Sequence, residues 1–198
     1  MSKHLGNILE PIPLMDTHGA DAVRWFMAAG GSPWSSRRVG HGTIQETVRK
    51  VLMTYVNTVA FQSLYARANN WSPALRDATS AGAAVAPQGA VTGTVPEELA
   101  SAATERQEGP PVHVLDRWLV SARNTLTRQV TEALEDFDTQ RAGALLATFV
   151  DDLSNWYVRR SRRRFWEGSD GALQTLHDTL DVVTRLMAPL VPFVTERV

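Results

Sequence analysis

Residues 115–136, LDRWLVSARNTLTRQVTEALED, carry the clearest structural signal in this chain. Their apolar side chains recur every three or four positions, at Leu115, Trp118, Leu119, Ala122, Leu126, Val130 and Leu134. This spacing gathers them on one side of an α-helix, whereas a half-buried strand would need strict alternation of apolar and polar residues. We therefore predict a helix from Leu115 to Asp136 that packs through one face.

The same periodicity extends in both directions from this helix, and no segment shows sustained strand alternation. Asp16 or Thr17 suits the cap of a helix that ends at Ala29. Asp138 or Thr139 suits the cap of a helix at Gln140–Arg163. The apolar stripe of a helix at Thr43–Asn69 would end with Val59 and Leu64. The further predicted helices cover Asp16–Ala29, Thr43–Asn69, Gln140–Arg163 and Ala172–Ala188. We predict an all-α protein, an antiparallel helix bundle whose last member, after Pro192, is truncated.

The composition fits a packed globular protein and excludes several classes of site. Of 198 residues, 43% are hydrophobic, six are Trp and none is Cys. Without cysteine there are no disulfides or thiolate metal sites, which is typical of a cytoplasmic location. The five His show no metal-ligand spacing, so we expect no metal site. No signal peptide and no apolar run of ~20 residues is present, so we expect no membrane span.

The segment from Trp71 to Val112 differs from the rest of the chain. It consists mostly of Ala, Gly, Thr, Ser and Pro, and aromatic residues are absent after Trp71. Such a composition cannot bury enough apolar surface to offset the entropy lost on ordering. We predict a flexible insertion, in which only Pro96–Gln107 has features of a short helix.

A basic and aromatic string, NWYVRRSRRRFW, occupies residues 155–166. The formal net charge of the chain is −1, so any basic surface must be local. Guanidinium groups bind phosphate oxygens and neighbouring aromatic rings stack on bases, which makes RNA a candidate ligand. Alternatively, carboxylates at Asp116, Glu135, Asp151 and Asp152 could pair with several of the arginines. We expect some arginines to brace the bundle and others to face RNA; the candidates are Trp156, Arg159, Arg160, Arg162, Arg163 and Arg164.

Two more arginines, Arg37 and Arg38, follow Trp34 in an irregular connection between two predicted helices. They either contact an RNA backbone at a domain junction or lie in water.

The first seven residues, MSKHLGN, have the composition of a loop that closes over a triphosphate. Gly6 lets the backbone bend, and Lys3 can neutralise the charge that moves onto a leaving pyrophosphate. Ser2 and His4 would shape this loop. A solvated lysine near a chain end is the alternative reading of Lys3.

This loop resembles the KMSKS loop of class I aminoacyl-tRNA synthetases, with His4 where the family usually has serine and without its first lysine. Gly19, Ala20 and Asp21 match the helix that follows it in the family. GSPWS at 31–35 and SNWYVRRSRRRFW at 154–166 are similar to the isoleucyl-tRNA synthetase branch.

The resemblance implies a KMSKS-loop remnant and connecting helix at residues 1–39, left from a catalytic domain. Residues 40–198 would form a helical anticodon-binding domain. Lys3 would be catalytic, and Ser2, Lys3 and His4 would contact ATP, which acts with Mg²⁺. The implied partners are tRNA(Ile), and isoleucine and ATP through a catalytic domain that is missing here.

The rest of that catalytic machinery is absent from these residues. There is no His-Ile-Gly-His motif, amino-acid pocket or editing domain, so we expect the chain alone neither to activate isoleucine nor to edit valine. Three other readings stay open: the same segment of a valyl enzyme, a non-catalytic RNA-binding helical module, and a purely structural bundle. Salt dependence of RNA binding separates the last two.

Overall fold

The computed structural model describes residues 9–32, 34–36, 38–73 and 113–198. This part of the chain contains helices and no strand. The elements are α1 (Pro11–His18), α2 (Ala20–Ala29), α3 (His41–Thr47), η2 (Val48–Leu52), α4 (Met53–Ala68), α7 (Val114–Glu135), α8 (Thr139–Asp151), η4 (Asp152–Val158), α9 (Arg159–Trp166), α10 (Asp170–Met187) and α11 (Pro192–Arg197).

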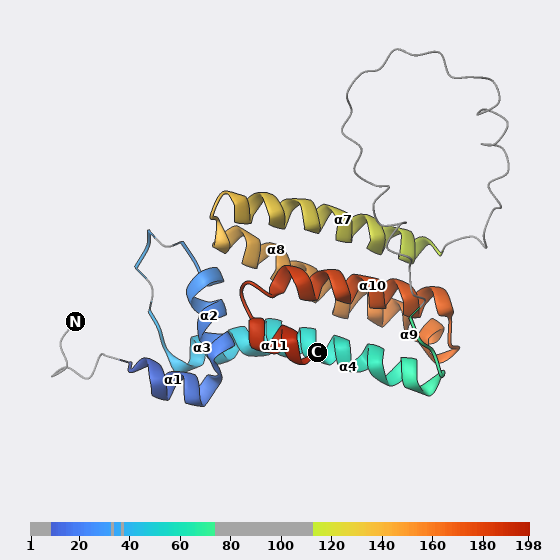
Figure 1. The fold of residues 1–198 in the computed structure, drawn as a ribbon, viewed down its shortest axis with the longest axis horizontal. Helices are drawn as coiled ribbons and strands as arrows, with labels where there is room; N and C mark the ends of the chain where they lie inside the picture. Colours follow the sequence, from blue (N-terminus) through green and yellow to red (C-terminus); the bar gives the residue numbers. More distant parts are fainter. Residues whose placement is uncertain (1–8, 33, 37, 74–112) are drawn as a thin grey trace, which may run out of the picture.

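Four long rods form an antiparallel bundle, as the sequence predicted. One rod runs without a break through α3, η2 and α4, and another through α8, η4 and α9, because η2 and η4 are π-helical turns within longer helices. Figure 1 shows α7 and α8 side by side along one edge of the bundle, with α10 between α7 and α4. Asp138 accepts a hydrogen bond from the amide of Arg141 and so caps α8, as expected.

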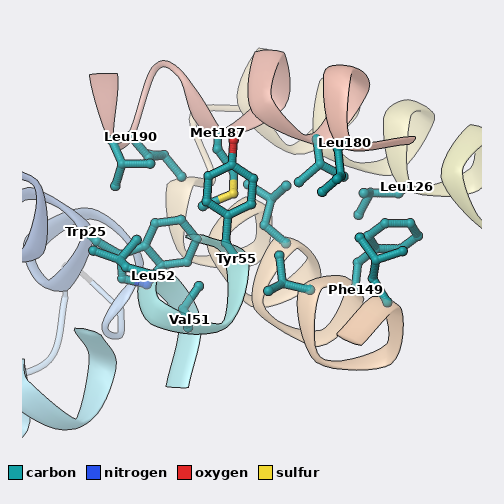
Figure 2. Close-up of a cluster of buried hydrophobic side chains, with 14 of the residues drawn as sticks. Trp25, Val51, Leu52, Tyr55, Leu126, Phe149, Leu180, Met187 and Leu190 are labelled. Carbon is teal, nitrogen blue, oxygen red and sulfur yellow. The ribbon is translucent and has the colours of Figure 1, made fainter. Parts of the chain in front are cut away.

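Side chains from all four rods fill the core (Figure 2), among them Tyr55, Leu126, Phe149 and Met187. Tyr55 reaches across the bundle, and its hydroxyl lies 2.5 Å from the Thr184 hydroxyl. Burial raises the pKa of Tyr55 because the charged phenolate would be poorly solvated there.

The predicted helix Asp16–Ala29 is wrong at its start. Two helices occur instead, and the chain turns between them at Gly19, whose φ of 87° is unfavourable for residues with a side chain. Asp16 and Thr17 lie inside α1 and cap nothing in α2. Asp21 lies in the first turn of α2 and is buried.

The buried face of α4 also differs from the predicted stripe. Leu64 is 65% exposed, and Thr58 and Gln62 lie in the interior. These polar side chains are tolerated because each donates to a backbone carbonyl: Thr58 to Thr54, and Gln62 to Leu173. The prediction followed apolar residue types, whereas the helix geometry placed two polar side chains inside. The amide oxygen of Gln62 has no hydrogen-bond partner among the described residues.

The segment α1–α2 packs firmly against the bundle. Gly143 allows α8 to approach α2, since a Cβ at that position would lie 2.1 Å from the Cβ of Ala29. The Thr139 hydroxyl donates to the carbonyl of Ala28 at 2.8 Å. Asp21 accepts from the amide of Val194 at 2.7 Å and thereby joins α2 to α11.

Several sequence predictions fall outside the described residues, namely most of the 71–112 insertion with its helix at Pro96–Gln107, and the loop at 1–7. The division into 1–39 and 40–198 stays a prediction. Among the helices that the structure describes, none combines the length and apolar character needed to cross a membrane.

Candidate nucleic-acid interface

The rod formed by η4 and α9 carries the arginine string and has one buried side. Tyr157, Ser161 and Phe165 follow one another at intervals of four residues, and all three are fully buried. A helix turns by about 100° per residue, so the arginines between them are distributed around the remaining circumference. Their positions decide which arginines face the bundle and which face solvent.

Arg164 faces the bundle. Its guanidinium binds Asp116 of α7 through two hydrogen bonds of 2.7 and 2.5 Å. The Tyr157 hydroxyl donates to the same carboxylate at 2.8 Å. Asp116 is 2% exposed, so Arg164 neutralises a buried charge and ties α9 to α7.

The pKa values of Tyr157 and Arg164 shift in the directions that this geometry requires. Burial raises the pKa of Tyr157, and the negative charge of Asp116 raises it further. The hydrogen bond to Asp116 raises the pKa of Arg164. At neutral pH the Tyr157 phenol therefore stays protonated and the Arg164 guanidinium stays charged.

Arg163 faces solvent and pairs with Glu167 one turn further along the helix, at 2.7 Å. That hydrogen bond raises the pKa of Arg163. A pair this exposed contributes little to stability and can exchange partners.

Arg160 lies over the ring of Trp156, with 5.4 Å between the guanidinium carbon and the ring centroid. Trp156 in turn packs against Trp118 of α7, with ring centroids 4.2 Å apart. The sequence predicted Trp118 inside the core, but it is 36% exposed. An arginine and two indoles thus form one surface cluster, of which sequence reasoning found Trp156 and Arg160 only.

On the opposite flank of the rod, Arg159 and Arg162 border a groove of about 440 Å³ between α4 and the η4–α9 rod. Both are exposed, and neither contacts a carboxylate among the described residues. The groove is lined by Asn57, Thr58, Phe61, Ser154, Asn155 and Val158. Sequence reasoning missed this set, because α4 and the arginine string are far apart in the chain.

The remaining candidates do not join this surface. Arg38 is exposed in the connection between α2 and α3, which Figure 1 shows at the other end of the bundle from α9. Arg37, Ser2, Lys3 and His4 fall outside the described residues. Within the described ranges, no three His, Asp or Glu side chains come together as a metal site.

Residues 116–198 match the family model described as the anticodon-binding domain of tRNA ligase. An isoleucine–tRNA ligase of Cutibacterium acnes is 67% identical over the whole chain, and one of Streptomyces avermitilis is 63% identical over the whole chain. Over its whole length, the chain is similar to a part of these isoleucine–tRNA ligases. It spans only 18% and 16% of these two relatives' lengths.

One solved structure shares the fold of this chain. It is the crystal structure of the ternary complex of Agrobacterium radiobacter K84 agnB2 LeuRS-tRNA-LeuAMS. It superposes with a TM-score of 0.61 and 17% identity, and the match covers 100% of this chain and 20% of that one. The helical architecture of this chain is therefore found in that solved structure as well.

Proposed function

We propose that this chain is the tRNA-binding, anticodon-binding segment of an isoleucine–tRNA ligase. The parent enzyme would form isoleucyl-adenylate from ATP and isoleucine, and then charge tRNA(Ile) in the cytoplasm. The observation that carries the proposal is the set of exposed arginines, Arg159, Arg160 and Arg162, which contact no carboxylate in the described part of the chain. Ion pairing within the bundle does not account for these three cations on one helix.

The geometry supports different roles for the arginines of this helix. Arg159 and Arg162 would bind backbone phosphates, because a guanidinium fork matches two phosphate oxygens. Arg160 stays positioned over Trp156, next to the partly exposed Trp118, and offers a flat surface on which a base can stack. Arg164 holds the helix in place from inside through Asp116.

The chemical steps belong to the parent enzyme in this proposal. ATP with Mg²⁺ and isoleucine would bind the catalytic part, where Lys3, Ser2 and His4 would form the loop near the phosphates. We expect the chain alone to give no isoleucine-dependent exchange of pyrophosphate into ATP. Measurable exchange by the isolated chain would overturn this part of the proposal.

Titration of fluorescently labelled tRNA(Ile) with the chain, at a series of salt concentrations, tests RNA binding. The double variant Arg159→Ala/Arg162→Ala should lower affinity and reduce the slope of log K against log salt by about two, since each lost phosphate contact removes about one unit. The matched control is Arg128→Ala/Arg185→Ala, which removes two exposed arginines from helices α7 and α10.

Equal salt slopes for the wild type and both double variants would favour the purely structural bundle. A comparison of tRNA(Ile) with tRNA(Val) separates the isoleucyl reading from the valyl one. The arginine contacts alone recognise phosphates and carry no sequence information, so any preference must come from groups that contact bases.

A further inference from the structure

Two histidines that are far apart in the sequence face each other at the surface of the protein. His18 is the last residue of α1, and His41 is the first residue of α3. The Nε2 atom of His18 lies 2.8 Å from the Nδ1 atom of His41, and the ring centroids are 5.0 Å apart. Because 23 positions separate the two residues, their spacing in the sequence does not indicate this pair.

The two helices hold these rings in place from the core. Leu14, one turn before His18, is buried, and Ile44, almost one turn after His41, is fully buried. His18 itself is half-buried and His41 is exposed. Both backbones are therefore anchored, while both imidazoles stay within reach of a dissolved ion.

The separation of the two nitrogens fits neighbouring ligands of one metal ion. Bonds from a metal to imidazole are about 2.0–2.1 Å long, so two nitrogens at a right angle around one ion are about 2.9 Å apart. At a tetrahedral angle they would be about 3.3 Å apart. The distance of 2.8 Å between His18 and His41 is closer to the right angle, which is typical of Cu²⁺ and Ni²⁺, whereas structural Zn²⁺ sites are tetrahedral.

The protonation chemistry of the pair also permits metal binding. In the hydrogen bond, one of the two facing nitrogens carries a proton and the other accepts it. A metal ion needs the lone pairs of both nitrogens, so the donating ring takes its other tautomer, with the proton on the nitrogen that faces away. Two neutral imidazoles therefore release no net proton, and the rings have only to turn until both lone pairs point at the ion.

We propose that His18 and His41 form a binding site for one divalent copper ion, with Ni²⁺ bound more weakly. The ion replaces the hydrogen bond between the rings and joins α1 to α3. In the described part of the chain no third His, Asp or Glu completes the site, so water fills the other coordination positions. The site lies outside the arginine string, and the inference is independent of RNA binding.

Titration of the whole 198-residue chain with copper tests the site. All proteins in the test carry His4→Gln, because a histidine close to a free amino terminus binds copper by itself. Calorimetric titration with CuCl₂, in a buffer that does not bind copper, should give one site per chain. The electron paramagnetic resonance spectrum of the bound ion should show two nitrogen ligands.

His18→Gln and His41→Gln each remove one ligand and keep a side chain that forms hydrogen bonds. Each should weaken copper binding by about tenfold or more, since even the loss of a group that only orients a ligand costs about tenfold. Each should also reduce the number of nitrogen ligands from two to one. His177→Gln is the matched control, because His177 is likewise half-buried and lies against an aromatic ring, that of Trp71, and it should change neither quantity.

The outcomes separate a copper site from a simple hydrogen bond. One copper ion with two nitrogen ligands, weakened in the His18 and His41 variants and kept in His177→Gln, supports the proposal. Absence of copper binding, binding that survives either folded variant, or equal weakening by His177→Gln overturns it. Circular dichroism without metal shows which variants fold. The two variants change ligands on different helices, so one folded variant is enough to decide.

Discussion

Arg164 and Arg159 lie on one helix, five positions apart, and differ in nearly every physical respect. Arg164 is held by a bidentate contact to the buried Asp116, whereas Arg159 is exposed and borders a groove. Removing Arg164 would leave a buried charge without compensation, while Arg159 already has water as its partner. Both are arginines of one short basic string, so the rotation of the helix against α7 and α4 decides which of them meets a buried carboxylate and which faces solvent.

The largest effect should come from Arg164→Ala. It leaves Asp116 buried with Tyr157 alone as a partner, and we expect a loss of about 3 kcal/mol in the free energy of unfolding. Urea denaturation followed by circular dichroism measures it. Arg159→Ala is the control and should leave stability unchanged. Similar losses in both variants would contradict the claim that Arg164 stabilises the fold and Arg159 does not.

Tyr157→Phe should have the next largest effect on stability. The lost hydrogen bond to the Asp116 carboxylate should cost about 1.5 kcal/mol at pH 8.

The pH dependence of that variant follows from the raised pKa of Tyr157. In the unfolded chain the phenol ionises near pH 10, while the folded protein keeps it protonated, so the wild type loses stability as pH rises above about 10. This contribution is fully present below pH 10 and is absent in Tyr157→Phe. Urea denaturation at pH 8 and at pH 10.5 should therefore show a smaller difference between wild type and variant at the higher pH, and a constant difference would contradict the assignment.

For RNA binding we expect Arg159 to matter more than Arg164, which is the opposite of their expected effects on stability. Arg159→Ala should reduce the salt slope for tRNA by about one, because one phosphate contact is lost. Arg164→Lys keeps a positive charge beside Asp116 and should leave that slope unchanged. Equal slopes for Arg159→Ala and the wild type would show that Arg159 does not contact a phosphate of the tRNA.

The smallest expected effect belongs to Arg160→Ala. Its contact with Trp156 is a cation–π interaction at the surface, worth about 0.5 kcal/mol of stability. Tryptophan fluorescence should shift in this variant, since the cation over the Trp156 ring is removed. Arg163→Ala serves as the control, because its partner is Glu167 rather than a ring, and an identical shift there would contradict the contact.

The sequence predicted the bundle well because helical periodicity is a local property. The predicted helix at 115–136 differs from α7, Val114–Glu135, by one residue at each end. The prediction was wrong where local rules compete: at Gly19, which breaks one predicted helix into two, and in α4, where Gln62 rather than Leu64 faces the interior.

The candidate site was predicted in part. The string from Trp156 to Arg164 is contiguous in sequence and was found from its composition alone. The groove brings Asn57 and Phe61 of α4 close to Arg159. On the other flank of the rod, Trp118 packs against Trp156. Each of these contacts joins distant parts of the chain. Single-sequence reasoning has no signal for such contacts.

The amino-acid sequence by itself determined that this protein is helical and where its positive charge is concentrated. Both properties follow from the order of residues within one or two helical turns. Only the tertiary structure decided which arginine meets Asp116 and which ones border the groove. That choice depends on the orientation of α9 relative to α7 and α4, which the burial of Tyr157, Ser161 and Phe165 fixes.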